Sequence, residues 1–224
     1  MIREHNWLLQ LHGKRLLIFD FDGTVADTSP LHAAAFSQVL EPFGVDVNYS
    51  AIAGMRTAEA MRRCFQLAGR PFPEQVLNDL VAGKQNAVRS AIRNSLQPLP
   101  GVDKFLNWAR PKYRLAMVTS GSRGTVSLAL AVLGYEGIFD PLLTAEDVER
   151  SKPDPEGFLE ALRICGCSAS DAMVFEDSDS GVRASRAAGI ACWDVRTMSL
   201  DACEYPSEVI AGSPDIRSSL RTEP

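Results

Sequence analysis

The sequence has no apolar stretch long enough to cross a membrane and no apolar leader at its beginning. A membrane-spanning helix needs about 20 consecutive apolar residues. A signal peptide likewise needs an uninterrupted apolar segment, but the first thirteen residues are interrupted by Arg3, Glu4, His5, Asn6 and His12. These absences exclude a membrane-spanning protein and argue against export, so we expect a cytoplasmic protein.

The sequence also lacks the cysteine spacing that is typical of metal and redox sites. Its five cysteines are Cys64, Cys165, Cys167, Cys192 and Cys203. None of them forms a C-x-x-C pair, and no histidine stands close to Cys165 and Cys167. An odd number of cysteines without export features indicates reduced thiols in packing or surface positions.

An excess of positive charge is missing as well. Lysine and arginine number 23 against 28 acidic residues, which gives a net charge of −5. Nucleic acids and anionic membranes attract basic surfaces, so we expect neither as a main partner. A local anion site remains compatible with this charge, because it needs only a few side chains. The sequence leaves the oligomeric state open.

The second part of the chain alternates between helical and strand-like segments. Buried strands are expected at 16–19, 115–118, 141–143, 172–175 and 191–195. Helices are expected between and beside them at 102–109, 125–133, 155–165 and 182–188. Such alternation predicts an α/β fold, a Rossmann-like doubly wound parallel sheet with helices on both faces.

Residues 31–96 show no convincing strand. Apolar residues recur there with helical spacing, and we expect helices at 30–43, 57–68 and from Pro71 and Pro73 to Asn94. The strand at 16–19 has no partner until 115–118, so this block is an insertion. We therefore predict a catalytic core formed by 1–29 and 97–224, with an inserted all-α helical cap at 30–96.

The first strand leads directly into two carboxylates, Asp20 and Asp22, which Gly23 and Thr24 follow. Side chains two positions apart on an extended chain project to the same side. Two neighbouring carboxylates repel unless a proton or cation joins them, and magnesium prefers such oxygen ligands. For the bare Asp-x-Asp-Gly pattern, however, an ordinary polar turn is the more frequent explanation.

Three further polar stretches occur after predicted strands or in a stiff turn. They are Thr119-Ser120-Gly121, Lys152 before Pro153, and Glu176-Asp177. Hydroxyls and a flexible backbone suit phosphate oxygens, a fixed ammonium neutralises negative charge, and an acidic pair completes a magnesium shell. Each stretch alone is explained as well by helix capping or by a solvated lysine.

Together, the four stretches resemble, in their order and separation, the four motifs of the haloacid dehalogenase-like hydrolases over nearly the whole core. The helical insertion after the first motif is similar to the subgroup that includes β-phosphoglucomutase and many small-metabolite phosphatases. Further similarity to the bacterial fructose-1-phosphate and 6-phosphogluconate phosphatases lies at 87–90, 98–100, 174–177, 187–189 and 194–196.

The resemblance implies a magnesium-dependent phosphatase that acts on a small phosphorylated metabolite, with a sugar phosphate as the expected substrate. Asp20 would form an aspartyl-phosphate, and Asp22 would act as general acid and then as base. Lys152 would support the reaction, while Thr119, Ser120 and Gly121 would surround the phosphate. The implied Mg²⁺ ligands are Asp20, the main-chain carbonyl of Asp22, Glu176 and Asp177.

Two expectations concern the surroundings of this site. Neighbouring negative groups are expected to keep Asp22 neutral by raising its proton affinity. Substrate contacts in the cap are expected from Arg56 and Lys84, although a solvated helix charge is an equally good explanation for each. For His32, a surface or hinge position is the preferred interpretation over a catalytic role.

Alternatives to the phosphatase remain. Dehalogenases of this superfamily lack the second aspartate, and phosphonoacetaldehyde hydrolases replace it, so the presence of Asp22 argues against both. A β-phosphoglucomutase-type phosphotransferase shares the nucleophile and the acid/base. A non-catalytic protein that binds a phosphorylated ligand is also compatible with the fold, but it would need neither Asp20 nor Asp22 for chemistry.

Overall fold

The computed structural model of the protein describes residues 6–197 and 200–202. Its centre is a five-stranded parallel sheet with the strand order β3-β2-β1-β4-β5. The strands are β1 (Leu16–Phe19), β2 (Arg114–Val118), β3 (Leu142–Leu143), β4 (Ala172–Glu176) and β5 (Ala191–Asp194). The strand that carries the first motif is therefore the middle strand, and the predicted α/β fold is confirmed.

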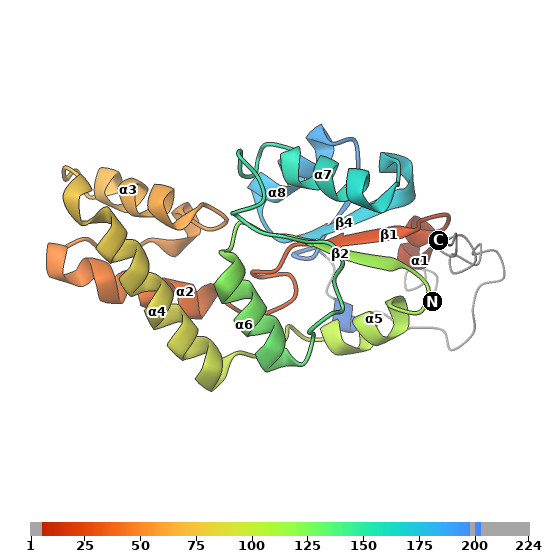
Figure 1. Cartoon of the computed structure of the whole chain (residues 1–224), viewed down its shortest axis with the longest axis horizontal. Coiled ribbons are helices and arrows are strands. Elements are labelled where there is room, and N and C mark those ends of the chain that lie inside the picture. The colour runs from red at the N-terminus through yellow and green to blue at the C-terminus, as the bar shows by residue number, and fades with distance from the viewer. Residues whose placement is uncertain (1–5, 198–199, 203–224) are drawn as a thin grey trace, which may run out of the picture.

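Helices cover both faces of this sheet, as Figure 1 shows. They are α5 (Val102–Ala109), α6 (Arg123–Leu133), α7 (Glu156–Cys165) and α8 (Asp179–Ala187). In β1, Leu17 and Phe19 pack in one apolar cluster, and Leu16 and Ile18 pack in another on the opposite face. This two-sided burial explains why the strand is uninterruptedly apolar.

The predicted helix and strand positions agree with the structure to within one to three residues, apart from one helix start. We expected a helix to open at Pro71 and Pro73, but α4 (Leu77–Ser95) begins later, after the 3₁₀ turn Glu74–Val76. Pro73 has φ −81° and ψ 83°, which lies outside the helical region. The prediction of the helix start was therefore wrong.

The inserted block contains only helices, as expected. α2 (Ser29–Leu40), α3 (Thr57–Leu67) and α4 lie to one side of the sheet in Figure 1. They share an apolar cluster of their own, which includes Phe36, Leu40, Met61 and Phe65. A separate core in this block agrees with an inserted helical cap, while the exact domain boundaries remain a prediction.

The short helix α1 (Asn6–Leu11) precedes β1 and buries Leu11 in the main core. No helix within residues 6–197 and 200–202 is both long enough and apolar enough to cross a membrane.

The register of the sheet brings the polar stretches to one edge. Phe19 in β1 lies beside Met117 in β2 and beside Phe175 in β4. Asp20 therefore leaves the sheet next to Glu176 and close to Val118. Ligands of open parallel sheets bind at the carboxyl ends of the strands, so the described edge is where a functional site is expected.

Candidate active site

Lys152 joins the ends of three strands. Its Nζ donates hydrogen bonds to Asp20 Oδ1 at 2.5 Å, to Glu176 Oε1 at 2.6 Å and to the main-chain oxygen of Val118 at 2.9 Å. The ammonium is buried together with both carboxylates. Burial disfavours the charged lysine, but the two carboxylates outweigh it and raise the pKa of Lys152 above its usual value. Lys152 is therefore a fixed positive charge at the bottom of the site.

The second oxygen of Glu176 is held by the N-terminus of α8. Oε2 accepts hydrogen bonds of 2.9 Å from the main-chain N–H of Asp177, the main-chain N–H of Ser178 and the Ser178 hydroxyl. Gly181 makes room for it, since a Cβ there would lie 1.7 Å from Glu176 Oε1. The local sequence thus fixes this carboxylate in one position, where the helix dipole also favours it.

Asp20, Glu176 and Asp177 form a cluster whose carboxylate oxygens lie within 4.8 Å of one another. Burial is the largest influence on Asp20 and Asp177 and raises the pKa of both, with further increases from the neighbouring carboxylates; the pKa of Asp177 rises to about 7. When all three carboxylates are ionised, the single ammonium of Lys152 leaves two negative charges uncompensated. A divalent cation would balance them.

The approach of Asp177 to the first motif depends on Gly23. Gly23 has φ +78°, and a Cβ at this position would lie 2.1 Å from Asp177 Oδ2. Only glycine combines this left-handed backbone with such a close approach. The residues present therefore fit a hard cation: three carboxylates converge, and the backbone beside them leaves the required space.

Asp22 is near this cluster, but its side chain contacts residues at the start of the inserted helices. Its Oδ1 accepts a hydrogen bond of 2.6 Å from Thr28 Oγ1 and lies 3.4 Å from His32 Nε2. Burial raises the pKa of Asp22, but His32, Thr28 and the charge of Lys84 together lower it to about 2. The expectation that adjacent negative charges keep Asp22 neutral was therefore wrong, because its immediate neighbours are donors rather than carboxylates.

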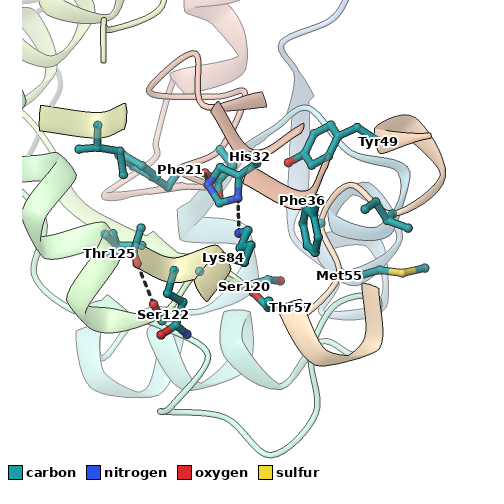
Figure 2. Close-up of a pocket in the computed structure, with 17 residues that line it drawn as sticks. Phe21, His32, Phe36, Tyr49, Met55, Thr57, Lys84, Ser120, Ser122 and Thr125 are labelled. Atoms are coloured by element: carbon teal, nitrogen blue, oxygen red, sulfur yellow. Dashed lines mark hydrogen bonds and ion pairs between the residues drawn. The ribbon is translucent and has the colours of Figure 1, made fainter. Parts of the chain in front are cut away.

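Lys84 and His32 extend this arrangement into the helical block. Figure 2 shows them pointing toward each other, and Lys84 Nζ lies 2.7 Å from His32 Nδ1. If the ammonium donates to Nδ1, the proton of a neutral imidazole is at Nε2, which faces Asp22. Lys84 is buried and lies over the Phe36 ring at 4.7 Å. Burial lowers the pKa of Lys84 to about 8.

Replacing Lys84 by Met is expected to stabilise the protein at pH 7. Between pH 8 and 10.5 the unfolded chain binds the lysine proton more tightly than the folded protein, so wild-type stability rises with pH across this window. Lys84→Met removes both that rise and the burial penalty, which gives a gain of about 1 to 2 kcal/mol at pH 7. Urea unfolding at pH 7 and pH 10 measures both effects.

The exposed Lys104 on α5 provides the control for this substitution. Lys104→Met is expected to change stability by less than about 0.5 kcal/mol at either pH. If Lys84→Met were less stable than wild type at pH 7, this would contradict the conclusion that burial of the Lys84 charge destabilises the folded protein.

The other residues predicted to bind substrate divide into two groups. Ser120 and Gly121 line a pocket beside Asp22, whereas the Thr119 hydroxyl accepts a hydrogen bond of 3.0 Å from Gly121 N–H and so stabilises the turn itself. Arg56 lines a neighbouring pocket with Ser120 and Lys152, donates a hydrogen bond of 2.6 Å to the main-chain oxygen of Val148, and has a buried Nε without a hydrogen-bond partner. The role of each residue in binding substrate remains a prediction.

The sequence did not predict the roles of several residues near Asp22. His32 read first as a hinge residue, and Thr28 and Tyr49 were given no separate role, yet His32 and Tyr49 line the pocket and Thr28 binds Asp22. One signal was present: Thr28 and His32 are four positions apart around the start of α2, so they reach the same side of one helical turn. The contact of His32 with Lys84, 52 positions later, had no local signal.

Comparison with known proteins agrees with this geometry. The sequence model of the haloacid dehalogenase-like hydrolase family matches residues 17–195. Fructose-1-phosphate phosphatase YqaB of Escherichia coli strain K12 is 34% identical over 81% of this chain and 96% of the relative. A phosphorylated carbohydrates phosphatase of Thermotoga maritima is 30% identical over 78% of this chain and 81% of the relative.

A solved structure supports the fold. The β-phosphoglucomutase of Clostridium difficile superimposes with a TM-score of 0.73, covering 84% of this chain and 88% of that chain at 22% sequence identity. At this identity the likeness concerns the fold alone. Because the family match spans most of the sequence and includes β1, β4 and β5, the chain belongs to the haloacid dehalogenase-like hydrolases.

Proposed function

We propose that this protein, a phosphoric monoester hydrolase by its family, cleaves a small phosphorylated sugar through a covalent intermediate on Asp20. The observation that carries this proposal is the pair of aspartates with different surroundings. Asp20 contacts Lys152, while Asp22 contacts Thr28 and His32. Two carboxylates in different environments suit two different chemical roles. Fructose 1-phosphate and 6-phosphogluconate are the candidate substrates, and the names of both relatives agree with a sugar phosphate.

In the first stage, an oxygen of Asp20 attacks phosphorus and forms the aspartyl-phosphate. The bond between phosphorus and the ester oxygen breaks, and the departing alkoxide takes a proton from Asp22. Asp22 is ionised in the free site, with a pKa of about 2. A phosphate dianion beside it raises that pKa, so the proton is taken up as substrate binds.

In the second stage, water attacks the same phosphorus and the bond to Asp20 breaks. Asp22, now a carboxylate, takes the proton of the water and is ready for the next cycle. Lys152 neutralises charge on Asp20 and on the phosphoryl oxygens. Ser120 and the Gly121 backbone are placed to contact the remaining oxygens, since both line the pocket.

The cation that this family typically uses would be held by Asp20, Glu176 and Asp177, with the main-chain carbonyl of Asp22 as a further proposed ligand. Its chemistry would be to neutralise the phosphoryl group and to lower the repulsion between that group and the carboxylates. Mg²⁺ is the proposed ion because all the donors are hard oxygens.

The helical block at 30–96 is proposed to act as a cap that covers the leaving group, with the core formed by 1–29 and 97–224. His32, Tyr49, Thr57 and Lys84 from this block line the same pocket as Ser120 and Gly121 from the core. Such a cover excludes water while the phosphoryl group is transferred.

A mutase and a non-catalytic binding protein remain the alternatives, and one experiment separates all three. Protein stripped of metal with EDTA is assayed for phosphate release from fructose 1-phosphate, 6-phosphogluconate and a chromogenic phosphate ester, before and after Mg²⁺ is restored. We expect release only with Mg²⁺, at least about 100-fold above the stripped protein. Isomerisation of glucose 1-phosphate in place of release would favour the mutase, and neither reaction would favour the binding protein.

A further inference from the structure

The pocket beside Asp22 is polar but contains little charge at the end where the leaving group would lie. Its acidic and basic lining residues are Asp22, His32 and Lys84, which cluster together. The other polar lining residues are neutral: Tyr49, Thr57, Gln85, Ser120, Ser122 and Thr125. Figure 2 shows Thr57, Ser122 and Thr125 around the same space as Lys84.

The positive charge of Lys84 is already engaged. Its Nζ contacts His32 Nδ1 at 2.7 Å and the face of Phe36 at 4.7 Å, and Asp22 is the carboxylate that supports its charge. A second anionic group would have to compete with Asp22 for this ammonium. Lys84 therefore positions the acid/base instead of offering an independent anion site.

The arginines nearest the pocket beside Asp22 do not line it. Arg56, on the cap, lines a neighbouring pocket with Ser120 and Lys152, where it donates to the main-chain oxygen of Val148 at 2.6 Å and its buried Nε has no hydrogen-bond partner. Arg89, on α4, donates to Thr125 Oγ1 at 3.3 Å and does not line the pocket. At the start of α6, Arg123 pairs with Asp147, and its main-chain N–H donates to Glu146 at 2.9 Å. Within the described residues, no arginine lines the pocket beside Asp22 itself.

We infer that the substrate is a phosphate monoester of an uncharged polyol, and that Thr57 and Gln85 read its hydroxyl groups. This inference rests on the proposed phosphatase function and narrows it. A hydroxyl and a carboxamide donate to and accept from sugar hydroxyls, whereas a second phosphate or a carboxylate would be enclosed without a compensating cation. Monophosphates of uncharged sugars are thus preferred over bisphosphates and over phosphorylated sugar acids.

The test compares sugar monophosphates with related substrates that carry a second anionic group. The kcat/KM for phosphate release is measured with Mg²⁺ for fructose 1-phosphate against fructose 1,6-bisphosphate, and for glucose 6-phosphate against 6-phosphogluconate. We expect fructose 1-phosphate and glucose 6-phosphate, which carry no second anionic group, to be favoured at least about tenfold in kcat/KM. Equal values of kcat/KM, or higher values for fructose 1,6-bisphosphate and 6-phosphogluconate, would overturn the inference while leaving the phosphatase function intact. No release from any ester would instead refute the phosphatase itself.

Two substitutions test the named residues. Thr57→Arg is expected to reduce the preference for fructose 1-phosphate over the bisphosphate at least about fivefold, because it introduces a cation at the leaving-group end. Gln85→Leu is expected to lower kcat/KM more for fructose 1-phosphate than for a chromogenic aryl phosphate, which has no sugar hydroxyls. Equal losses on both esters would indicate a structural role for Gln85 and overturn its assignment.

Discussion

Replacing Asp20 by Asn is expected to lower kcat for phosphate release by a factor on the order of 10⁴ or more. An amide oxygen is not a nucleophile of comparable strength, so the aspartyl-phosphate does not form. The fold is expected to persist, because Lys152 keeps its hydrogen bonds to Glu176 Oε1 and to the Val118 carbonyl. Phosphate release under saturating Mg²⁺, with circular dichroism as a check on folding, measures the effect.

The matched control is Asp27→Asn. Asp27 is an exposed aspartate of the same loop, and its replacement is expected to leave kcat within about twofold of wild type, as for a surface site. If Asp20→Asn retained activity within tenfold of wild type, Asp20 would not be the nucleophile. Water would then have to attack the substrate directly.

Replacing Lys152 by Met is expected to be the most destabilising of the substitutions considered. The ammonium contacts two carboxylates whose side chains are 10% and 0% exposed. Removing one member of a buried ion pair leaves charge uncompensated and costs about 3 to 5 kcal/mol. Activity is expected to fall about 10³-fold as well, because no other cationic side chain in the described structure contacts Asp20.

Urea unfolding of metal-free protein measures this loss of stability, with Lys104→Met as the control for removal of an exposed lysine. The double variant Lys152→Met with Asp20→Asn provides a second arm. It is expected to recover part of the lost stability, because one of the two uncompensated carboxylates is gone. A single Lys152→Met variant within about 1 kcal/mol of wild type would contradict the buried bridge.

Much of the fold follows from local pattern. The apolar run in β1 predicts a strand buried on both faces, and helical spacing in residues 31–96 predicts a block without strands. Both features repeat over short stretches, so they are visible before the chain is folded. The start of α4 was not predictable in the same way, because the prolines at 71 and 73 suited a helical first turn but lie in an irregular segment.

The candidate site, too, was predictable in part from the sequence. The order of Asp20, Thr119, Lys152 and Glu176 along the chain, each after a strand or in a stiff turn, placed them at one edge through the general rule for parallel sheets. The structure then joined Lys152 to Asp20 across 132 positions. Strand order and register bring the two residues together. The motif pattern by itself predicts that Lys152 and Asp20 are close but does not define their contact.

The surroundings of Asp22 were decided by tertiary structure. Sequence proximity suggested that Asp20 and Asp22 share one negative environment, whereas the fold turns Asp22 toward Thr28, His32 and the Lys84 charge, which lower its pKa. Lys84 reaches this place because α4 packs beside α2. The sequence by itself determined the strands, the helical insertion and the set of reactive residues, since these depend on local pattern. Only the tertiary structure decided each group's charge partner, because electrostatic environment depends on distances between segments far apart in the chain.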